Sequence, residues 1–259
     1  MKEVRDVLAA IPGFADAKVV SRLSDGPTNQ SYEILNGSDR YVLRLDRAEA
    51  ARLGLDRRSE REVVESVARA GMAPEPAWYS PAGDAYLRPW VEGRPWSLDD
   101  LRSPKNIERL AVLLRRLHTL PRAGRHFDPL EAASRYAREI GTFESARCLV
   151  KAVEAFEDLD PEKATLCHND LVCANIVEGN CLVLIDWEYA GMGDPFFDLA
   201  VVAQHHGLPG SLARHFVEAY LERAPSPDEW CRFEKQCRFY GALLELWTLR
   251  TGGVNPAVR

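Results

Sequence analysis

The sequence predicts an α+β fold of two lobes: a small β-rich N-terminal lobe with one helix, and a larger, mainly helical C-terminal lobe. Three observations carry this prediction. Short runs rich in β-branched and aromatic residues fill the first third of the chain, proline and glycine cluster near residue 90, and long amphipathic runs follow residue 100. We therefore expect lobes at residues 1–88 and 96–259, joined by a hinge or linker at 89–95.

The N-terminal lobe is expected to contain five strands. Residues 17–23, 30–35 and 40–45 are short β-rich runs. The first two are separated by the turn-rich hexapeptide Ser24-Asp25-Gly26-Pro27-Thr28-Asn29, and Asn36-Gly37-Ser38-Asp39 has the composition of a hairpin turn. Two further strands are expected at residues 78–79 and 85–91.

One helix is expected in this lobe, from Ser59 as its N-cap to Ala70. Three valines inside it form an apolar stripe, and Gly71 follows at its end.

The C-terminal lobe is expected to be helical apart from one β-rich island at residues 165–186. Amphipathic periodicity predicts its helices. They cover residues 107–120, 136–157, 211–221 and 229–250.

The composition is that of an ordinary globular protein. The formal net charge is −6, without a basic face for nucleic acid, and no apolar run is long enough for a signal peptide or a membrane span. None of the six cysteines forms a Cys-x-x-Cys pair, so we expect reduced thiols in the cytoplasm rather than zinc ligands or disulfides. The negative balance is compatible with a cationic substrate. No prediction of the oligomeric state follows.

The residues that carry chemistry lie between 168 and 186. His168-x-Asp170-x-x-x-x-Asn175 is followed by an apolar strand that leads into Asp186. Phosphoryl transfer needs a carboxylate that accepts the proton of the acceptor hydroxyl, and oxygen ligands for the magnesium that bridges the phosphates. The spacing predicts Asp170 as the catalytic base and Asn175 and Asp186 as Mg²⁺ ligands, with His168 supporting the loop.

A simpler interpretation is that aspartate and asparagine populate turns, because their side chains bond to nearby backbone. For either half of the motif alone, that interpretation would be preferred. Both halves together, separated by a short hairpin, favour phosphoryl transfer.

The same residues carry a family resemblance. His168-Asn169-Asp170-Leu171 with Asp186-Trp187-Glu188-Tyr189-Ala190-Gly191 resembles the choline/ethanolamine kinase branch of the aminoglycoside phosphotransferase superfamily. The resemblance covers nearly the whole chain and is dense between residues 166 and 200. It implies a protein-kinase-like fold, ATP and Mg²⁺ as cofactors, and a small alcohol as substrate. Asp198 matches a family aspartate that braces the catalytic loop.

The resemblance also implies a nucleotide site in the N-terminal lobe. In this family a Gly-Gly-x-x-Asn loop covers the ATP phosphates with backbone N–H groups. Asp25 replaces the first glycine here, and a carboxylate is not an obvious neighbour for phosphate. Arg44 would grip phosphate oxygens, with Glu60 as its helix partner and Glu62 or Glu65 as alternatives. The implied ATP contacts are Gly26, Thr28, Asn29, Arg44 and Glu60.

The acceptor site implied by the family holds an amine-bearing alcohol between aromatic faces and carboxylates. Tyr240 and Trp247 are seven residues apart and would share a helix face. The implied acceptor residues are Glu188, Tyr189, Tyr240 and Trp247, with Glu245 as a further carboxylate. One departure concerns His205, which stands where choline kinases carry a substrate-facing glutamate.

Several acceptors are therefore compatible with the predicted kinase. Choline or ethanolamine is the first choice, thiamine the second, and an aminoglycoside or amino sugar the third. A nucleotide-binding pseudokinase is the alternative from another class, suggested only by Asp25. A protein kinase is disfavoured, because the short run from Asp186 to Asp198 leaves no room for a long activation segment.

Overall fold

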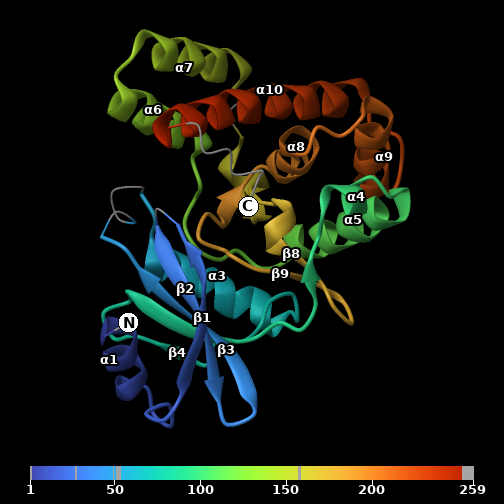
Figure 1. Cartoon of the computed structure of the whole chain (residues 1–259). Coiled ribbons are helices and arrows are strands. Elements are labelled where there is room, and N and C mark those ends of the chain that lie inside the picture. Colours follow the sequence, from blue (N-terminus) through green and yellow to red (C-terminus); the bar gives the residue numbers. More distant parts are fainter. Residues whose placement is uncertain (1, 27, 49, 51–53, 157–158, 253–259) are drawn as a thin grey trace. The chain divides into compact units, whose positions relative to one another are not determined.

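The computed structural model describes residues 2–26, 28–48, 50, 54–156 and 159–252 (Figure 1). The chain divides into two compact units, Met1–Glu92 and Gly93–Arg259. The division falls within residues 89–95, where the sequence predicts a linker.

The N-terminal unit is built on a five-stranded antiparallel sheet in the order β1-β2-β3-β5-β4. Its strands are β1 (Lys18–Asp25), β2 (Asn29–Asn36), β3 (Asp39–Asp46), β4 (Trp78–Tyr79) and β5 (Ala85–Pro89). All five predicted strands are confirmed, with ends that differ by a residue or two. Gly37 has φ 62° in the two-residue loop between β2 and β3, a conformation that glycine adopts without strain.

Helix α3 (Arg57–Arg69) begins earlier than predicted. Its N-cap is Asp56, whose carboxylate accepts from the backbone N–H groups of Arg58 and Ser59. The prediction of Ser59 as N-cap is wrong, because the chain offers two capping residues and the earlier one is used. Ser59 is instead buried within the first turn, next to Glu60. The end of the helix is confirmed, with Ala70 as C-cap and Gly71 at φ 70°.

The prediction of a single helix in this unit is also wrong, because α1 (Lys2–Ala10) precedes the sheet. Val4 and Leu8 are four residues apart and share one helix face. They pack with Ile34, Leu43 and Leu87 of the sheet in one apolar cluster. A segment of this length gives a weak helical pattern by itself, since an isolated short helix is marginal and tertiary packing decides it.

The C-terminal unit is mainly helical, as predicted. Its helices are α4 (Leu98–Leu101), α5 (Pro104–His118), α6 (Pro129–Ile140), α7 (Phe143–Ala155), α8 (Pro195–His205), α9 (Gly210–Leu221) and α10 (Pro227–Arg250). The predicted β-rich island contains β7 (Thr165–Cys167), β8 (Ile176–Glu178) and β9 (Leu182–Leu184). β8 pairs with β9 and β6 (Arg94–Pro95), while β7 pairs with β10 (Gly191–Gly193).

Packing among the helices places the loop that follows β7. Figure 1 shows the long helix α10 with α6, α7 and α8 against it. β7 contacts α5 and α8, so the loop at residues 168–175 starts beside two helices. In the described part of the chain, no helix is both long and apolar enough to cross a membrane.

The predicted helix at residues 136–157 is two helices, α6 and α7. Gly141 ends α6 in the left-handed conformation at φ 66°, and Thr142 caps α7 by accepting from the Ser145 N–H. Amphipathic periodicity alone missed this break, although glycine followed by threonine is a stop-and-start signal. Glu157, the last residue of the predicted helix, lies outside the described residues.

Gly141→Ala is expected to lower the free energy of unfolding by about 1 kcal/mol, because a Cβ is disfavoured at positive φ. The added Cβ would meet only the Arg138 carbonyl oxygen at 3.8 Å, an ordinary contact, so backbone strain is the sole cost. Gly210→Ala is the matched control: Gly210 begins α9, and nothing lies within 4 Å of the point that an added Cβ would occupy. Urea denaturation of both variants checks this, and equal stabilities would contradict it.

Candidate active site

The loop at residues 168–175 is fastened by the carboxylate of Asp198 in α8. Asp198 is fully buried, and its Oδ2 and Oδ1 accept from the backbone N–H groups of His168 at 2.9 Å and Asn169 at 2.7 Å. His118 Nε2, at the end of α5, donates to Oδ2 at 3.1 Å. Three N–H donors thus surround one buried carboxylate, which satisfies its charge and fixes the start of the loop.

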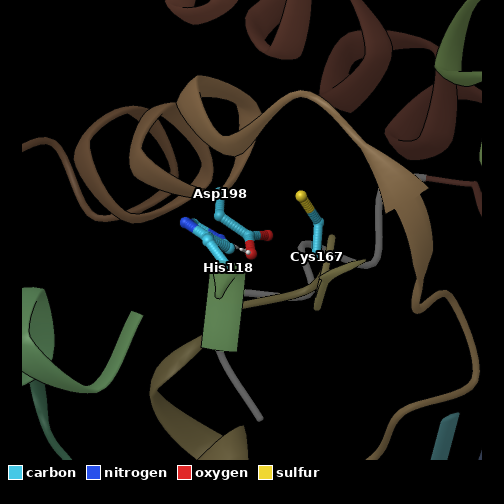
Figure 2. A group of neighbouring side chains, drawn as sticks. All are labelled: His118, Cys167 and Asp198. Atoms are coloured by element: carbon cyan, nitrogen blue, oxygen red, sulfur yellow. Dashed lines mark hydrogen bonds and ion pairs between the residues drawn. The ribbon is translucent and has the colours of Figure 1, made fainter. Parts of the chain in front are cut away.

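Figure 2 shows the side chains of His118, Cys167 and Asp198 close together. The atoms of these three residues that could bind a metal lie within 4.8 Å of one another. This trio does not fit a metal ion. The Asp198 oxygens already accept three N–H groups. Burial, with the Asp198 charge nearby, raises the pKa of the Cys167 thiol well above its usual range, so the thiol stays protonated. His118 and Asp198 instead form a hydrogen-bonded brace for the loop, and Cys167 lies next to it.

His168 connects the loop to the segment that carries Asp186. Its Nδ1 accepts from the Asp170 N–H at 3.3 Å, and its Nε2 donates to the Ile185 carbonyl at 3.0 Å. Burial lowers the pKa of His168, which agrees with a neutral ring that donates once and accepts once. Its ring centroid lies 4.5 Å from that of Trp187. The predicted supporting residue therefore links the two halves of the motif.

Two non-glycine residues of the site have left-handed backbones, Asn169 at φ 65° and Asp186 at φ 64°. Such conformations cost of order 1–3 kcal/mol and persist where surrounding contacts impose them. Asn169 Nδ2 donates to the Tyr189 carbonyl at 2.9 Å, which ties the loop to the chain beyond Asp186.

Asp170, Asn175 and Asp186 are brought together. Asn175 Nδ2 donates to the Asp170 carbonyl at 2.8 Å and to Asp170 Oδ2 at 3.1 Å. The Asn175 carbonyl in turn accepts from the Ile185 N–H at 3.0 Å. Burial, followed by repulsion from the Asp186 carboxylate, raises the pKa of Asp170 to about 7. Two carboxylates close enough to influence each other in this way lie beside one amide.

This donor set fits a hard divalent cation. Asn175 donates both of its side-chain hydrogen bonds to Asp170. Its Oδ1 accepts no hydrogen bond from the described residues. That oxygen and the Asp186 carboxylate are the kinds of ligand that Mg²⁺ prefers. A cation would also relieve the repulsion that raises the pKa of Asp170.

In the N-terminal unit, Arg44 of β3 and Glu60 of α3 form a bidentate ion pair with distances of 2.5 and 2.9 Å. Both are buried. Burial alone would raise the pKa of Glu60, but Arg44 and Arg57 outweigh it and hold the pKa low. Arg44 Nε also lies 3.1 Å from Asp46, and Arg57 Nε lies 2.7 Å from the same carboxylate. Asp46 and Arg57 were not predicted, since both occupy positions usual for surface residues.

The turn between β1 and β2 is closed by a hydrogen bond from the Gly26 N–H to the Asn29 carbonyl at 3.0 Å. Thr28 and Asn29 are buried, and Pro27 lies outside the described residues. Asp25 contacts Arg22 at 2.9 Å and also pairs with Arg47. The carboxylate that departs from the family pattern is therefore accompanied by two arginines.

The predicted acceptor aromatics do not form one stack. Tyr240 places its hydroxyl 2.7 Å from His205 Nδ1, while Trp247 contacts Tyr136 with ring centroids 5.5 Å apart. Within the described residues, no ring contact joins Tyr189, Tyr240 and Trp247. His205 is buried, and burial followed by the neighbouring His206 lowers its pKa to about 4.

Tyr189 and Glu188 are half-buried directly after Asp186 and Trp187. Burial raises the pKa of Tyr189 well above its usual range, and Tyr136, Glu188, Asp170 and Asp186 raise it further, in that order. Tyr136 of α6 is the ring partner of Trp247, a contact that spacing along the chain could not reveal. Glu245 is exposed on α10 and pairs with Lys151 at 2.7 Å.

Comparison with known proteins identifies a family. A family model described as "Phosphotransferase enzyme family" matches residues 19–232. The chain is 25% identical over 277 residues to a probable choline kinase 1 of Arabidopsis thaliana, covering 90% of this chain and 80% of that protein. It is 34% identical to a thiamine kinase of Shigella boydii over 137 residues, about half of each protein.

The chain also matches a shorter segment of Protein LicA of Haemophilus influenzae, with 37% identity over 70 residues. That segment spans only 26% of the relative.

Solved structures share the fold. A choline/ethanolamine kinase family protein from Mesorhizobium loti has a TM-score of 0.74 at 23% identity, covering 100% of this chain and 88% of that one. The choline kinase LicA from Streptococcus pneumoniae has a TM-score of 0.78 at 18% identity, covering 100% and 96%. A structure of LicA in complex with AMP has a TM-score of 0.76 at 18% identity, covering 99% and 92%. The predicted protein-kinase-like α+β fold is confirmed.

Proposed function

Because the chain belongs to the phosphotransferase enzyme family, we propose that it transfers the γ-phosphoryl group of ATP to a primary hydroxyl of a small, amine-bearing metabolite. Choline or ethanolamine is the first choice of acceptor. The observation that carries the proposal is the convergence of Asp170, Asn175 and Asp186 at the braced loop.

In this mechanism Asp170 orients the acceptor hydroxyl and takes its proton as the new oxygen–phosphorus bond forms and the bond to the ADP oxygen breaks. Asn175 holds Asp170 Oδ2 through its NH₂ group, so the carboxylate keeps one orientation. Asn175 Oδ1 and the Asp186 carboxylate would hold Mg²⁺, which neutralises charge on the phosphate oxygens when bound.

The N-terminal unit is proposed to bind the nucleotide. Backbone N–H groups near Gly26, Thr28 and Asn29 would meet the phosphates, and Arg44 would add a guanidinium held by Glu60. The pairing of Asp25 with two arginines supports this assignment, because it offsets the negative charge beside the loop.

For the acceptor, the aromatic Tyr189, whose carbonyl accepts from Asn169 next to Asp170 in the chain, supports a cationic amine. His205 weighs against choline, since a histidine with a pKa of about 4 is neutral and supplies no fixed negative charge. Glu188, Tyr240 and Trp247 stay predicted acceptor residues. Thiamine and an aminoglycoside or amino sugar are the alternatives. A pseudokinase is disfavoured, because binding alone has no need of Asp170, Asn175 and Asp186 together.

A substrate panel tests the proposal. ADP release is measured with ATP, Mg²⁺ and each of choline, ethanolamine, thiamine and an aminoglycoside. We expect turnover with at least one amine alcohol, abolished by removing the divalent cation. Nucleotide binding without release of ADP on any acceptor would instead support the pseudokinase.

Glu60→Gln is expected to weaken ATP binding roughly tenfold and to lower the free energy of unfolding by about 3 kcal/mol, because it leaves the buried Arg44 charge without its bidentate partner. Glu65→Gln is the control on the same helix, since Glu65 makes a solvent-exposed pair with Arg61. Fluorescent-nucleotide titration and denaturant unfolding give the two quantities. Equal ATP affinities in the two variants would contradict the assigned clamp.

A further inference from the structure

Helix α7 is apolar on two opposite sides. Its inner side packs against α6 and α10 and buries Ser145, Cys148, Ala152 and Ala155. On its outer side Phe143 is 81% exposed, Val150 56% and Val153 55%. A surface helix usually turns one apolar stripe to the core and polar residues outward, so a second apolar side is unusual. In the described part of the chain, nothing buries this outer side.

The exposed residues form a narrow stripe with the spacing of a coiled-coil seam. Phe143, Ala146, Val150 and Val153 recur at intervals of three, four and three residues, and all four are exposed. We call these four residues the outer stripe. A straight seam of this kind fits another helix with the same spacing better than a flat surface.

Two residues of opposite charge lie along one side of the outer stripe. Arg147 and Glu154 are both exposed and lie seven residues apart, so they follow one side of the stripe. No ion pair joins either side chain to another described residue. In an antiparallel pair of α7 helices with Phe143 opposite Val153 of the second copy, Arg147 of each copy lies beside Glu154 of the other.

We propose that α7 is a self-association surface, through which two copies of this chain pair antiparallel about a two-fold axis. The arrangement is isologous, so each favourable contact occurs twice. A parallel pair would offer Arg147 and Glu154 no charged partner, because the positions they would face are Thr142, Leu149 and Phe156. Charge complementarity therefore selects both the partner and its direction.

The size of the outer stripe determines how tightly two copies can bind. Thirteen residues make a seam about 20 Å long. One phenylalanine, two valines and one alanine would bury on the order of 400 Å² per copy, about half of a standard interface. We expect a weak, concentration-dependent dimer in the micromolar range. A membrane surface is a poorer match, because a helix that lies on lipid carries a predominantly basic polar face.

Sedimentation velocity over a range from low to several hundred micromolar protein tests the proposal. The parent chain is expected to shift from monomer to dimer, and Phe143→Glu to stay monomeric, because it places a charge in the seam. Val112→Glu is the matched control, since Val112 is 47% exposed on α5, outside the stripe. A parent that stays monomeric throughout would overturn the proposal.

Charge reversal distinguishes the antiparallel dimer from non-specific hydrophobic association. Arg147→Glu places two acidic contacts across the seam and is expected to weaken the dimer roughly tenfold. Adding Glu154→Arg restores both pairs with reversed sign and should recover the parent affinity. Both positions are exposed, so folding is preserved. A double variant no tighter than the single one would overturn the antiparallel arrangement. None of these measurements depends on catalysis, so they stand apart from the test of the proposed function.

Discussion

Replacing Asp170 with asparagine is expected to lower kcat by roughly 10²–10⁴-fold, because the amide cannot accept the proton of the attacking hydroxyl. The change is nearly isosteric, and the Asn175 NH₂ group can still donate to the retained oxygen. KM for the acceptor should therefore change much less than kcat. This split distinguishes a group that acts in the transition state from one that only binds.

The same variant is expected to be more stable than the parent in the absence of divalent cations. The pKa of Asp170 is raised from 3.8 to about 7 by burial and then by Asp186. Between these values the folded state holds a proton that the unfolded state has released, so stability falls as pH rises through this window. Asparagine cannot ionise, and at pH 8 its free energy of unfolding should exceed that of the parent by roughly 1–2 kcal/mol.

Two measurements check this combination. Steady-state kinetics gives kcat and KM, and urea denaturation in chelator at pH 5 and pH 8 gives the stability difference. Asp16→Asn is the control, because Asp16 is an exposed loop residue of the other unit. If Asp170→Asn is as active as the parent, Asp170 is not the catalytic base. If the variant is less stable than the parent at pH 8, the ionised Asp170 is not destabilised by burial and by Asp186.

Spacing along the chain predicted the part of the site whose geometry is local, and the family resemblance supplied Asp198 and the Arg44–Glu60 pair. Asp170, Asn175 and Asp186 lie within 17 positions, on one loop and the hairpin after it, so spacing alone brings them together. His118 and Tyr136 were not predicted, because they lie on α5 and α6 and are brought to the site only by helix packing. Nothing in their neighbouring residues distinguishes them from ordinary core aromatics.

The fold was predicted with the same limitation. The strands of the N-terminal unit follow from short β-rich runs and their turns, and these are local signals. The N-cap Asp56 was missed because Ser59, another capping residue, follows three positions later. The break at Gly141 was missed because amphipathic periodicity continues across it, although glycine before threonine is a stop-and-start signal. Helix α1 depends on contacts with Ile34 and Leu87, which no local pattern contains.

Replacing Asp198 with alanine is expected to lower the free energy of unfolding of the C-terminal unit by about 3–5 kcal/mol. The change removes the acceptor of three buried donors, the backbone N–H groups of His168 and Asn169 and the imidazole of His118. Each buried donor without a partner costs roughly 1–3 kcal/mol. The left-handed backbone of Asn169 also loses the contact that holds it, so activity should fall with stability.

Loss of activity alone would not show how Asp198 acts, because a destabilised chain also loses activity. Hydrogen exchange at the amides of residues 168 and 169 makes the distinction: both should lose protection in Asp198→Ala at a temperature where the helices remain folded by circular dichroism. Asp228→Ala is the control, since Asp228 is exposed in the first turn of α10. Unchanged protection at these two amides would mean that the loop keeps its conformation without the carboxylate. Asp198 would then stabilise the core without positioning Asp170.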